Sequence, residues 1–305
     1  MGAVYLCSPG CITPGVGSSP GREMPAGLGG RPVSLPSAGW VDPIDRPQRW
    51  IGRAVRFNRL DRLTQLALVA SHRAVQGYGL PRDRTRAGIV LGTAFGSHLT
   101  NEAFQIQLEQ LGAAEASPAL FTHTLPSSAV GAISIQFGLQ GPTVTLTEGI
   151  GAGVAAVALA AQMVAQGEAD WMLAGAADTL SPTLLAAAGA EAGRLAEGAA
   201  FFVVVPGAAG AVARIAAADQ GRVGEAEVEQ AVLDKAGLVR GQIQTRLVYL
   251  ADGDYARQER HGRSLSAAPL LGATDLLQHH GETLPALITV RDHQGTTDVV
   301  CLTSP

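Results

Sequence analysis

The chain has 305 residues, of which 47% are apolar and only 5% aromatic, and it contains 38 glycines. This length and composition predict a compact globular protein whose large core is built from small, tightly packed side chains. The formal net charge of -4, with arginines scattered along the chain, provides no basic stripe and argues against nucleic-acid binding.

Three cysteines, Cys7, Cys11 and Cys301, are an odd number without close pairing, and no charged segment followed by an apolar one opens the chain. A reducing, cytoplasmic setting is the simpler interpretation. The spacing of Cys7 and Cys11 is more typical of buried thiols than of a metal site, and we expect neither a metal nor a cofactor.

The first strand is predicted at residues 4–13. The Pro- and Gly-rich passage 14–47 has no periodicity and predicts a long surface loop, which we expect Trp40 and Trp50 to pin down. Apolar residues at helical spacing then predict a helix from Asp61 to Gly77.

A short strand is predicted at residues 87–91 and a helix from Gly96 to Gly112. The stretch 141–178 reads as a strand, a glycine turn at residues 149–153, a long apolar helix that stops at Gln166-Gly167, and a further strand from Trp171. A reaction centre is usually built at such a turn. The run 149–167 approaches the length of a membrane span, but its Ala and Gly content and Gln162 favour a buried helix.

The C-terminal part predicts a similar organisation on a smaller scale. Residues 199–216 read as a hairpin that turns at 206–210, and residues 286–303 repeat this form. Between them we expect a helix at 225–236, a strand at 246–251 and a helix that starts near Leu270. Alternating strands and helices indicate an α/β fold of two halves, residues 1–217 and 218–305, the second abbreviated.

The glycine turn also carries a family resemblance. GPTVTLTEGIGAG (residues 141–153) resembles the nucleophile-elbow segment of β-ketoacyl synthases, with Ile150 where these enzymes have a cysteine. The segments FTHTLPSSAVGAISIQFGLQGP (121–142) and EGAAFFVVV (197–205) resemble the flanking stretches in the same order. The resemblance implies a thiolase-like fold, with two related α/β halves in a layered αβαβα arrangement.

A ketosynthase also needs two histidines and a lysine, and the resemblance implies that these are replaced here. Asp252 stands at the position of the first histidine, and Ala268 and Ala273 stand at those of the lysine and the second histidine. The only lysine, Lys235, lies on a different predicted helix. Since an aliphatic side chain cannot attack a thioester, Ile150 is expected only to pack.

This combination resembles the chain-length-factor subunits of type II polyketide synthases, which lack the nucleophile and pair with an active ketosynthase. It implies a heterodimer in which this chain shapes the tunnel for a growing polyketide or polyene chain on an acyl carrier protein. Such factors commonly have glutamine at the position of Ile150, so this residue is a departure.

Two segments are expected, by resemblance, to border the subunit interface and the acyl tunnel. Both contain a histidine, at positions 98 and 123, for which a merely hydrogen-bonded interface role is the alternative. In the first segment the spacing of the polar residues fits one wall of a helix. The expected residues are His98, Leu99, Asn101, Phe104 and Gln105 from the first segment, and Thr124, Leu125, Pro126 and Ser127 from the second.

Other interpretations stay open. The chain could be a stand-alone ketosynthase-like enzyme with a non-cysteine mechanism, and Glu148 could be its acid, although a lone carboxylate is more typical of a helix cap. GIGAG also resembles part of a nucleotide-binding fingerprint, but Val154 occupies the position of the third glycine. The adjacent pair His279-His280 lacks a spaced partner for a metal and indicates a solvated helix end.

Overall fold

A computed structural model describes residues 3–13, 39–42, 44, 47, 51, 55–189, 195–222, 224–250, 268–279, 284–291 and 296–305. The strands are β1 (Val4–Ile12), β2 (Ala87–Gly92), β3 (Thr143–Leu146), β4 (Trp171–Asp178), β5 (Gly198–Val205), β6 (Ala211–Gly221), β7 (Thr245–Leu250), β8 (Ala286–Arg291) and β9 (Thr297–Thr303). The α-helices are α1 (Arg62–Tyr78), α2 (His98–Leu111), α3 (Pro118–Phe121), α4 (Ser127–Phe137), α5 (Ala152–Ala165), α6 (Pro182–Ala188), α7 (Glu225–Ala236) and α8 (Ala268–His279).

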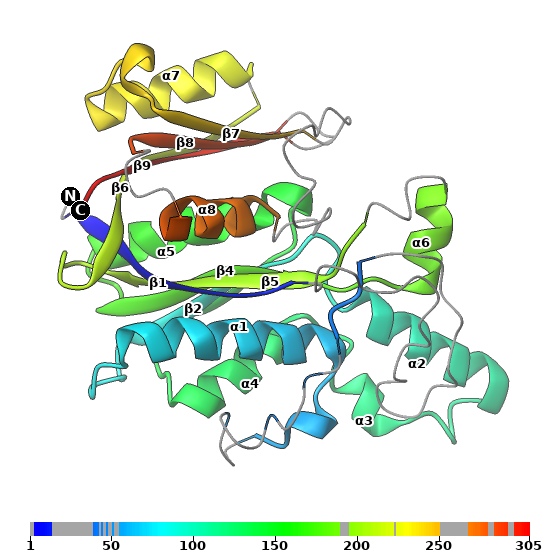
Figure 1. Cartoon of the computed structure of the whole chain (residues 1–305). Helices are drawn as coiled ribbons and strands as arrows, with labels where there is room; N and C mark the ends of the chain where they lie inside the picture. The colour runs from blue at the N-terminus through cyan, green and yellow to red at the C-terminus, as the bar shows by residue number, and fades with distance from the viewer. Residues whose placement is uncertain are drawn as a thin grey trace.

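The strands pair in the order β3-β2-β4-β5-β1-β6-β9-β8-β7. Long β6 pairs with β1 through its first residues and with β9 through its later ones, so it carries the chain from one sheet layer to the next. Figure 1 shows α1 and α4 below the first layer, α5 and α8 between the two layers, and α7 above the second. The predicted layered αβαβα fold of the thiolase-like class is confirmed.

The two halves repeat one pattern of strand pairing. β1-β5-β4-β2 and β6-β9-β8-β7 each contain two antiparallel pairings followed by a parallel one. Along the chain, α1 follows β1 and α7 follows β6 at the corresponding places of the two sets. Likewise, α5 precedes β4 and α8 precedes β8. Within the described part of the chain, β3 and helices α2 to α4 occur in the first half alone, so the second half is abbreviated. The boundary that we predict at 217/218 falls inside β6 and stays a prediction.

The core lies on both faces of the first sheet layer. Phe201 and Phe202 are adjacent in β5 and both fully buried, one against the α1 side and the other against the α5 side. Because successive strand residues point to opposite faces, a strand covered on both sides needs an apolar run. The buried, uncharged sequence of β5 and the wholly buried β4 follow from this position.

Most predicted elements form, and one predicted pairing is wrong. The helix at 225–236 has the predicted bounds, and α1 begins directly after Asp61, whose carboxylate accepts from the backbone N–H of Thr64. The C-terminal hairpin is confirmed, because β8 and β9 pair antiparallel. The hairpin at 199–216 is not: β1 lies between β5 and β6 and pairs with both. A local strand-turn-strand pattern cannot reveal a partner that comes from the start of the chain.

The remaining expectations concern the loop and the apolar run. Trp40 is buried, whereas Trp50 and most of the predicted surface loop 14–47 lie outside the described residues. The run that approached membrane-span length forms the short turn at Gly149–Gly151 and then α5, in the middle layer. In the part of the chain that the structure describes, no helix is both long enough and apolar enough to span a bilayer.

Candidate functional site

The glycine turn after β3 forms a tight elbow. Gly149 has a φ of 69°, and a 3-10 turn at Gly149–Gly151 leads directly into α5. The neighbouring strand β2 ends in Gly92, where an added Cβ would overlap the carbonyl oxygen of Ala152 in the first turn of α5. Two glycines, one for its left-handed backbone and one for close approach, therefore fix how α5 leaves the sheet.

Ile150 lies in this elbow, half-buried, and packs against the apolar cluster between α5 and the sheet layers. Its side chain has no group that could attack a thioester or transfer a proton. The elbow therefore carries an aliphatic side chain at the position where the resemblance implies a cysteine.

Two carboxylates lie near the elbow, those of Glu148 and Asp298, and nothing in the sequence near the elbow indicates Asp298. Asp298 of β9 is buried, and a Cβ added at Gly151 would overlap its Oδ2 atom. The Nε2 atom of Gln220 donates to Asp298 Oδ1 at 2.8 Å and lies 3.5 Å from Oε2 of Glu148. An ionised carboxylate at this place would oppose the negative oxyanion that forms during acyl transfer.

Of the three positions predicted to replace the histidines and lysine, the structure describes two. Asp252 lies outside the described residues, and Ala268 is the first residue of α8. Ala273 is buried on α8 and lines a small apolar cavity together with Val154 and Val157 of α5. His280 and the side chain of His279 also lie outside the described residues, and no group of three metal-ligating side chains occurs among the residues described.

The three thiols are not activated. Burial raises the pKa of Cys7 and of Cys301 to about 11, and burial also raises the pKa of Cys11, partly offset by Arg73. All three cysteines are free. A thiol with a raised pKa is a poor nucleophile at neutral pH because little of it is thiolate.

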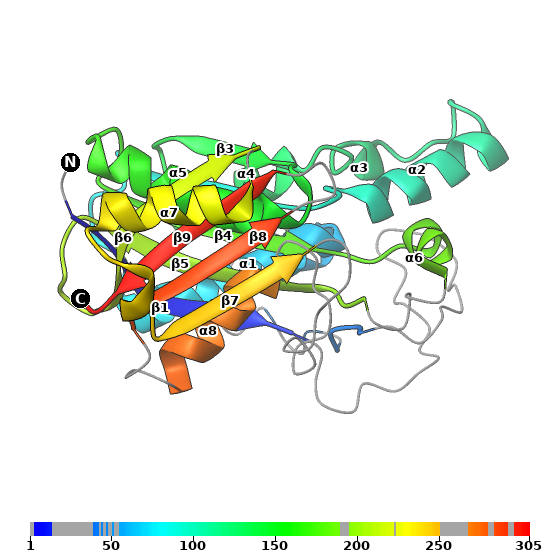
Figure 2. The ribbon, with the colours of Figure 1, turned by 90° about the horizontal axis from the view of Figure 1, so that it is seen from above.

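The two predicted tunnel segments lie together in a part of the molecule that projects from the layered body, seen clearly in Figure 2. We call residues 97–127, which contain α2 and α3, the arm. Thr100 is the one buried residue of α2. Phe104 and Phe121 contact each other with ring centroids 5.5 Å apart, and an added Cβ at Gly96 would lie 3.0 Å from Pro126.

The polar residues predicted to form one wall of α2 differ in their contacts, and His98 is the one that touches another helix. Its Nδ1 atom lies 2.9 Å from the Ser181 hydroxyl at the start of α6, so the ring serves a contact between helices. Asn101 and Gln105 are exposed, and Gln105 donates to Glu109 at 2.9 Å. Leu99 is half-buried. The polar wall of His98, Asn101 and Gln105 stays a prediction.

The second segment follows α3. Thr124 is half-buried, and its hydroxyl donates to the Phe121 carbonyl at 2.8 Å. Leu125 is 65% exposed, Pro126 is half-buried and Ser127 is exposed at the start of α4.

Exposed apolar side chains gather in this region. Of the seven large hydrophobic residues that are exposed in the described part of the chain, six lie between β2 and β3, and the exception is Val239. β3 is an edge strand that pairs with β2 alone. We call the six residues the apolar patch: Phe95, Ile106, Leu111, Phe121, Leu125 and Ile135.

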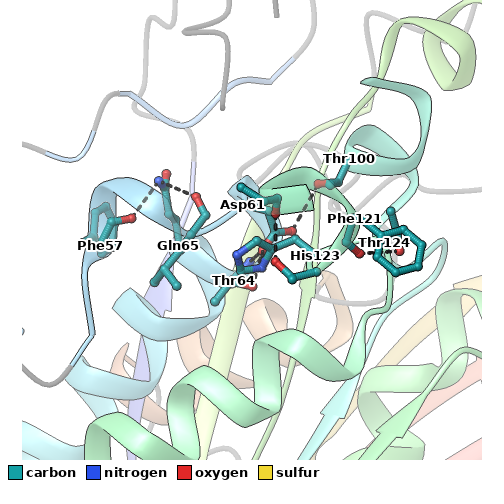
Figure 3. A network of polar contacts seen from close by, with 11 residues as sticks. Phe57, Asp61, Thr64, Gln65, Thr100, Phe121, His123 and Thr124 are labelled. Atoms are coloured by element: carbon teal, nitrogen blue, oxygen red, sulfur yellow. Dashed lines mark hydrogen bonds and ion pairs between the residues drawn. The ribbon is translucent and has the colours of Figure 1, made fainter. Parts of the chain in front are cut away.

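A polar cluster joins the arm to the body, as Figure 3 shows. Asp61 at the start of α1 is 3% exposed and accepts from the Thr64 hydroxyl and, at 3.4 Å, from the Thr100 hydroxyl of α2. His123 Nδ1 lies 3.5 Å from Asp61 Oδ1. Burial raises the pKa of Asp61, and Thr64 and His123 partly offset this effect. The sequence indicated Asp61 only as a helix start.

Comparisons with known proteins agree with this architecture. The family model of the β-ketoacyl synthase N-terminal domain matches residues 30–212, more than half of the chain. A putative polyketide β-ketoacyl synthase 1 of Streptomyces halstedii is 37% identical over 138 residues, 42% of this chain and 33% of that protein. The 3-oxoacyl-[acyl-carrier-protein] synthase 2 of Staphylococcus aureus (strain N315) is 34% identical over 140 residues, 45% of this chain and 33% of that protein. The matched stretch thus spans a third of these relatives.

Solved structures resemble the chain over its whole length. The ishigamide ketosynthase/chain length factor superposes with a TM-score of 0.81 at 22% identity, covering 99% of both chains. A type II polyketide synthase acyl-carrier protein in complex with its ketosynthase bound to the hexaketide, AntDE:AntF, gives 0.74 at 16% identity, covering 100% of this chain and 99% of that chain. These likenesses show the fold, and together with the family model they show that this chain belongs to the β-ketoacyl synthase family.

Proposed function

We propose that this chain is a non-catalytic subunit of the chain-length-factor type, which pairs with an active ketosynthase and shapes the tunnel for a growing polyketide or polyene chain. The observation that carries the proposal is Ile150 at the tip of a fully formed elbow. The elbow retains the fold of a reaction centre without a group that could form the acyl intermediate.

The surroundings of Ile150 support this absence of chemistry. Glu148 and Asp298 place acidic groups beside the elbow. A synthase site instead needs donors or cations that stabilise an oxyanion. The buried thiols of Cys7 and Cys301 offer no alternative nucleophile because their pKa is raised to about 11.

The proposed partner is a cysteine-bearing ketosynthase. The unpaired edge of β3 and the apolar patch lie in the same part of the sequence, so one partner could cover both. Obligate partners commonly bury more than about 2,000 Å² in total, and a surface of this kind is poorly tolerated in water. The ishigamide neighbour is a ketosynthase/chain length factor, which supports the same kind of pairing. Isolated, the chain should aggregate or self-associate.

The acyl carrier protein is the second proposed partner, because the substrate chain is expected to be carried on it. The AntDE:AntF neighbour is a ketosynthase in complex with such a carrier. A polyene rather than an aromatic product, and a cytoplasmic setting, stay predictions.

A test of the proposed non-catalytic role uses the full chain, alone and coexpressed with the cysteine-bearing ketosynthase proposed as its partner. After incubation with acyl-carrier thioester, intact-mass measurement should show an acyl adduct on the partner and none on this chain. An adduct on this chain would instead support the stand-alone enzyme. Failure of the two chains to copurify would contradict the heterodimer.

A test of the length-setting role changes Asn101 and Thr124 separately to Trp and to Ala in the reconstituted pair. Asn101 is exposed and Thr124 half-buried, so Trp should shorten the products and Ala should lengthen them. Gln110→Trp is the matched control, since Gln110 is exposed nine residues along α2, on the opposite side of the helix from Asn101. A uniform loss of activity with unchanged product lengths would show mere interface packing.

A further inference from the structure

Helix α2 is attached to the molecule mainly by polar contacts. Of its 14 residues, Thr100 is the one that is buried. Most helical stability in proteins comes from packing an apolar face, which α2 lacks at this attachment. The position of α2 therefore depends on a few hydrogen bonds and ring contacts that can be named.

Besides the ring contact of Phe104 with Phe121, three groups of polar contacts hold α2, and they act at different places. His98 and Glu102 join it to the start of α6, through the Ser181 hydroxyl at 2.9 Å and the Thr183 N–H at 3.2 Å. Farther along, Gln107 accepts from the Ser117 N–H at 3.1 Å, just before α3. The third contact is that of Thr100 with Asp61.

Asp61 differs from the other contacts because its carboxylate is shared by three elements. Its Oδ1 atom accepts from the Thr64 N–H of α1 at 3.4 Å and faces His123 at 3.5 Å, whereas its Oδ2 atom accepts from Thr100 of α2. His123 lies in the turn after α3, and Figure 3 shows its ring beside Asp61. Hydrogen bonds to a charged acceptor are stronger than neutral ones, and more so when buried.

The residues next to these contacts are those proposed to face the acyl chain. Asn101 follows Thr100, and Thr124 follows His123, so a shift at the carboxylate moves both candidate tunnel positions. The contacts with α6 do not link α2 to the turn after α3, and the Gln107 contact acts near the far end of α2.

We propose that Asp61 is a positioning residue that fixes the spacing between α2 and the turn after α3, and through it the width available to the growing chain. The consequence for product length rests on the proposed function, whereas the spacing itself does not.

The experiment compares Asp61→Ala, Asp61→Asn and Thr100→Val with the unchanged full chain. Asp61→Asn keeps one acceptor oxygen for Thr64 and places an NH2 group at the position of Oδ2, from which the Thr100 hydroxyl can accept, whereas Thr100→Val removes one hydroxyl while leaving the start of α1 intact. Asp83→Ala is the matched control, because exposed Asp83 also accepts from the N–H and the hydroxyl of a nearby threonine, Thr85, at 3.0 and 2.7 Å.

Hydrogen exchange of residues 98–104 and 121–127 is measured on each full chain, alone and with its partner. We expect exchange to accelerate by about tenfold or more in Asp61→Ala and less in Thr100→Val, since each loses a hydrogen bond to a charged group. The exchange rates of Asp61→Asn should be close to those of the unchanged protein, and Asp83→Ala should leave the exchange of these two segments unchanged. If Asp61→Ala does not fold, Thr100→Val decides the question.

Product lengths in the reconstituted pair separate the positioning role of Asp61 from the proposed length-setting function of the chain. A broader length distribution in Asp61→Ala at comparable turnover, restored by Asp61→Asn, supports the positioning role, because a loss of stability alone would lower turnover without changing lengths. Unchanged exchange in Asp61→Ala and Thr100→Val would overturn it. Faster exchange with unchanged products would uphold the positioning role and contradict the length-setting function.

Discussion

The elbow and the arm are built by opposite means. At the elbow, glycines allow backbone to approach backbone, and apolar side chains fill the remaining space. In the arm, α2 buries one residue and is attached by polar contacts such as that of Thr100 with Asp61. The comparison teaches that the elbow is fixed by close backbone packing, whereas the region proposed to shape the substrate chain depends on a few exchangeable contacts.

The largest expected difference between the two regions is in the free energy of unfolding that is lost when a glycine is changed to alanine. Gly92→Ala places a Cβ onto the Ala152 carbonyl oxygen, where only backbone could move aside. We expect the free energy of unfolding to fall by about 3 kcal/mol or more, at the upper end of overpacking. Gly112→Ala, at the end of α2, meets nothing within 4 Å and incurs only the strain of a φ of 81°. With a ψ of 167°, this backbone region is essentially restricted to glycine, and that cost is about 1 to 3 kcal/mol.

Denaturant unfolding of the full chain measures both effects. Equal losses from the two substitutions would show that the elbow is no more rigidly built than the arm. A Gly92→Ala protein as stable as the unchanged chain would contradict the close approach of α5 to β2.

The sequence was sufficient where the determining contacts are local. Helical spacing and Asp61 located α1, and the glycine triplet located the elbow. It was insufficient where a partner comes from far along the chain. Nothing near residues 198–221 indicates that β1 inserts between β5 and β6, and nothing near Ile150 indicates Asp298. The contact of His98 was not foreseen for the same reason, because its partner Ser181 precedes α6.

Thiol labelling tests how well the layered body protects its buried cysteines from a reagent in solution. The pKa of Cys7 and Cys301 is raised from 9.0 to about 11, so the thiolate fraction near pH 8 is about a hundredfold smaller than for an ordinary thiol. Iodoacetamide should modify both cysteines at least about a hundredfold more slowly in the folded chain than in denaturant. Mass spectrometry of the labelled peptides measures this ratio. Rapid labelling of Cys7 in the folded chain would mean that the body opens as readily as the arm.

The pH dependence of stability should have opposite signs at two carboxylates. Burial raises the pKa of Asp61, so its contribution is lost as pH rises from 3.8 towards the folded-state pKa. A hydrogen bond from Lys235 lowers the pKa of Asp219, so that contribution is present above 3.8 and is lost as pH falls below it.

Asp61→Asn should therefore gain stability relative to the unchanged chain as pH rises above about 4, whereas Asp219→Asn should lose it. For Asp219 the change is only a few tenths of a kcal/mol, because Lys235 is exposed and water screens the pair. Chemical unfolding between pH 3 and pH 7 measures both slopes. Slopes of equal sign would show that Asp61 is not held in a buried setting.

The smallest effect is expected from restoring the missing thiol at the elbow. Ile150→Cys supplies the atom that attacks a thioester, in a turn that already has the required shape. The substitution does not supply a base, and neighbouring carboxylates disfavour the thiolate rather than stabilise it. Groups that handle the carboxylate of the extender unit are also absent from the predicted positions, since Ala273 lies in an apolar cavity. We therefore expect no condensation above background when intact mass and product formation are measured with acyl-carrier thioester, in the chain alone and with a partner whose own nucleophile has been removed. Turnover by this single variant would show that the elbow is a dormant active site, and the contrast between a rigid, silent elbow and a tunable arm would no longer hold.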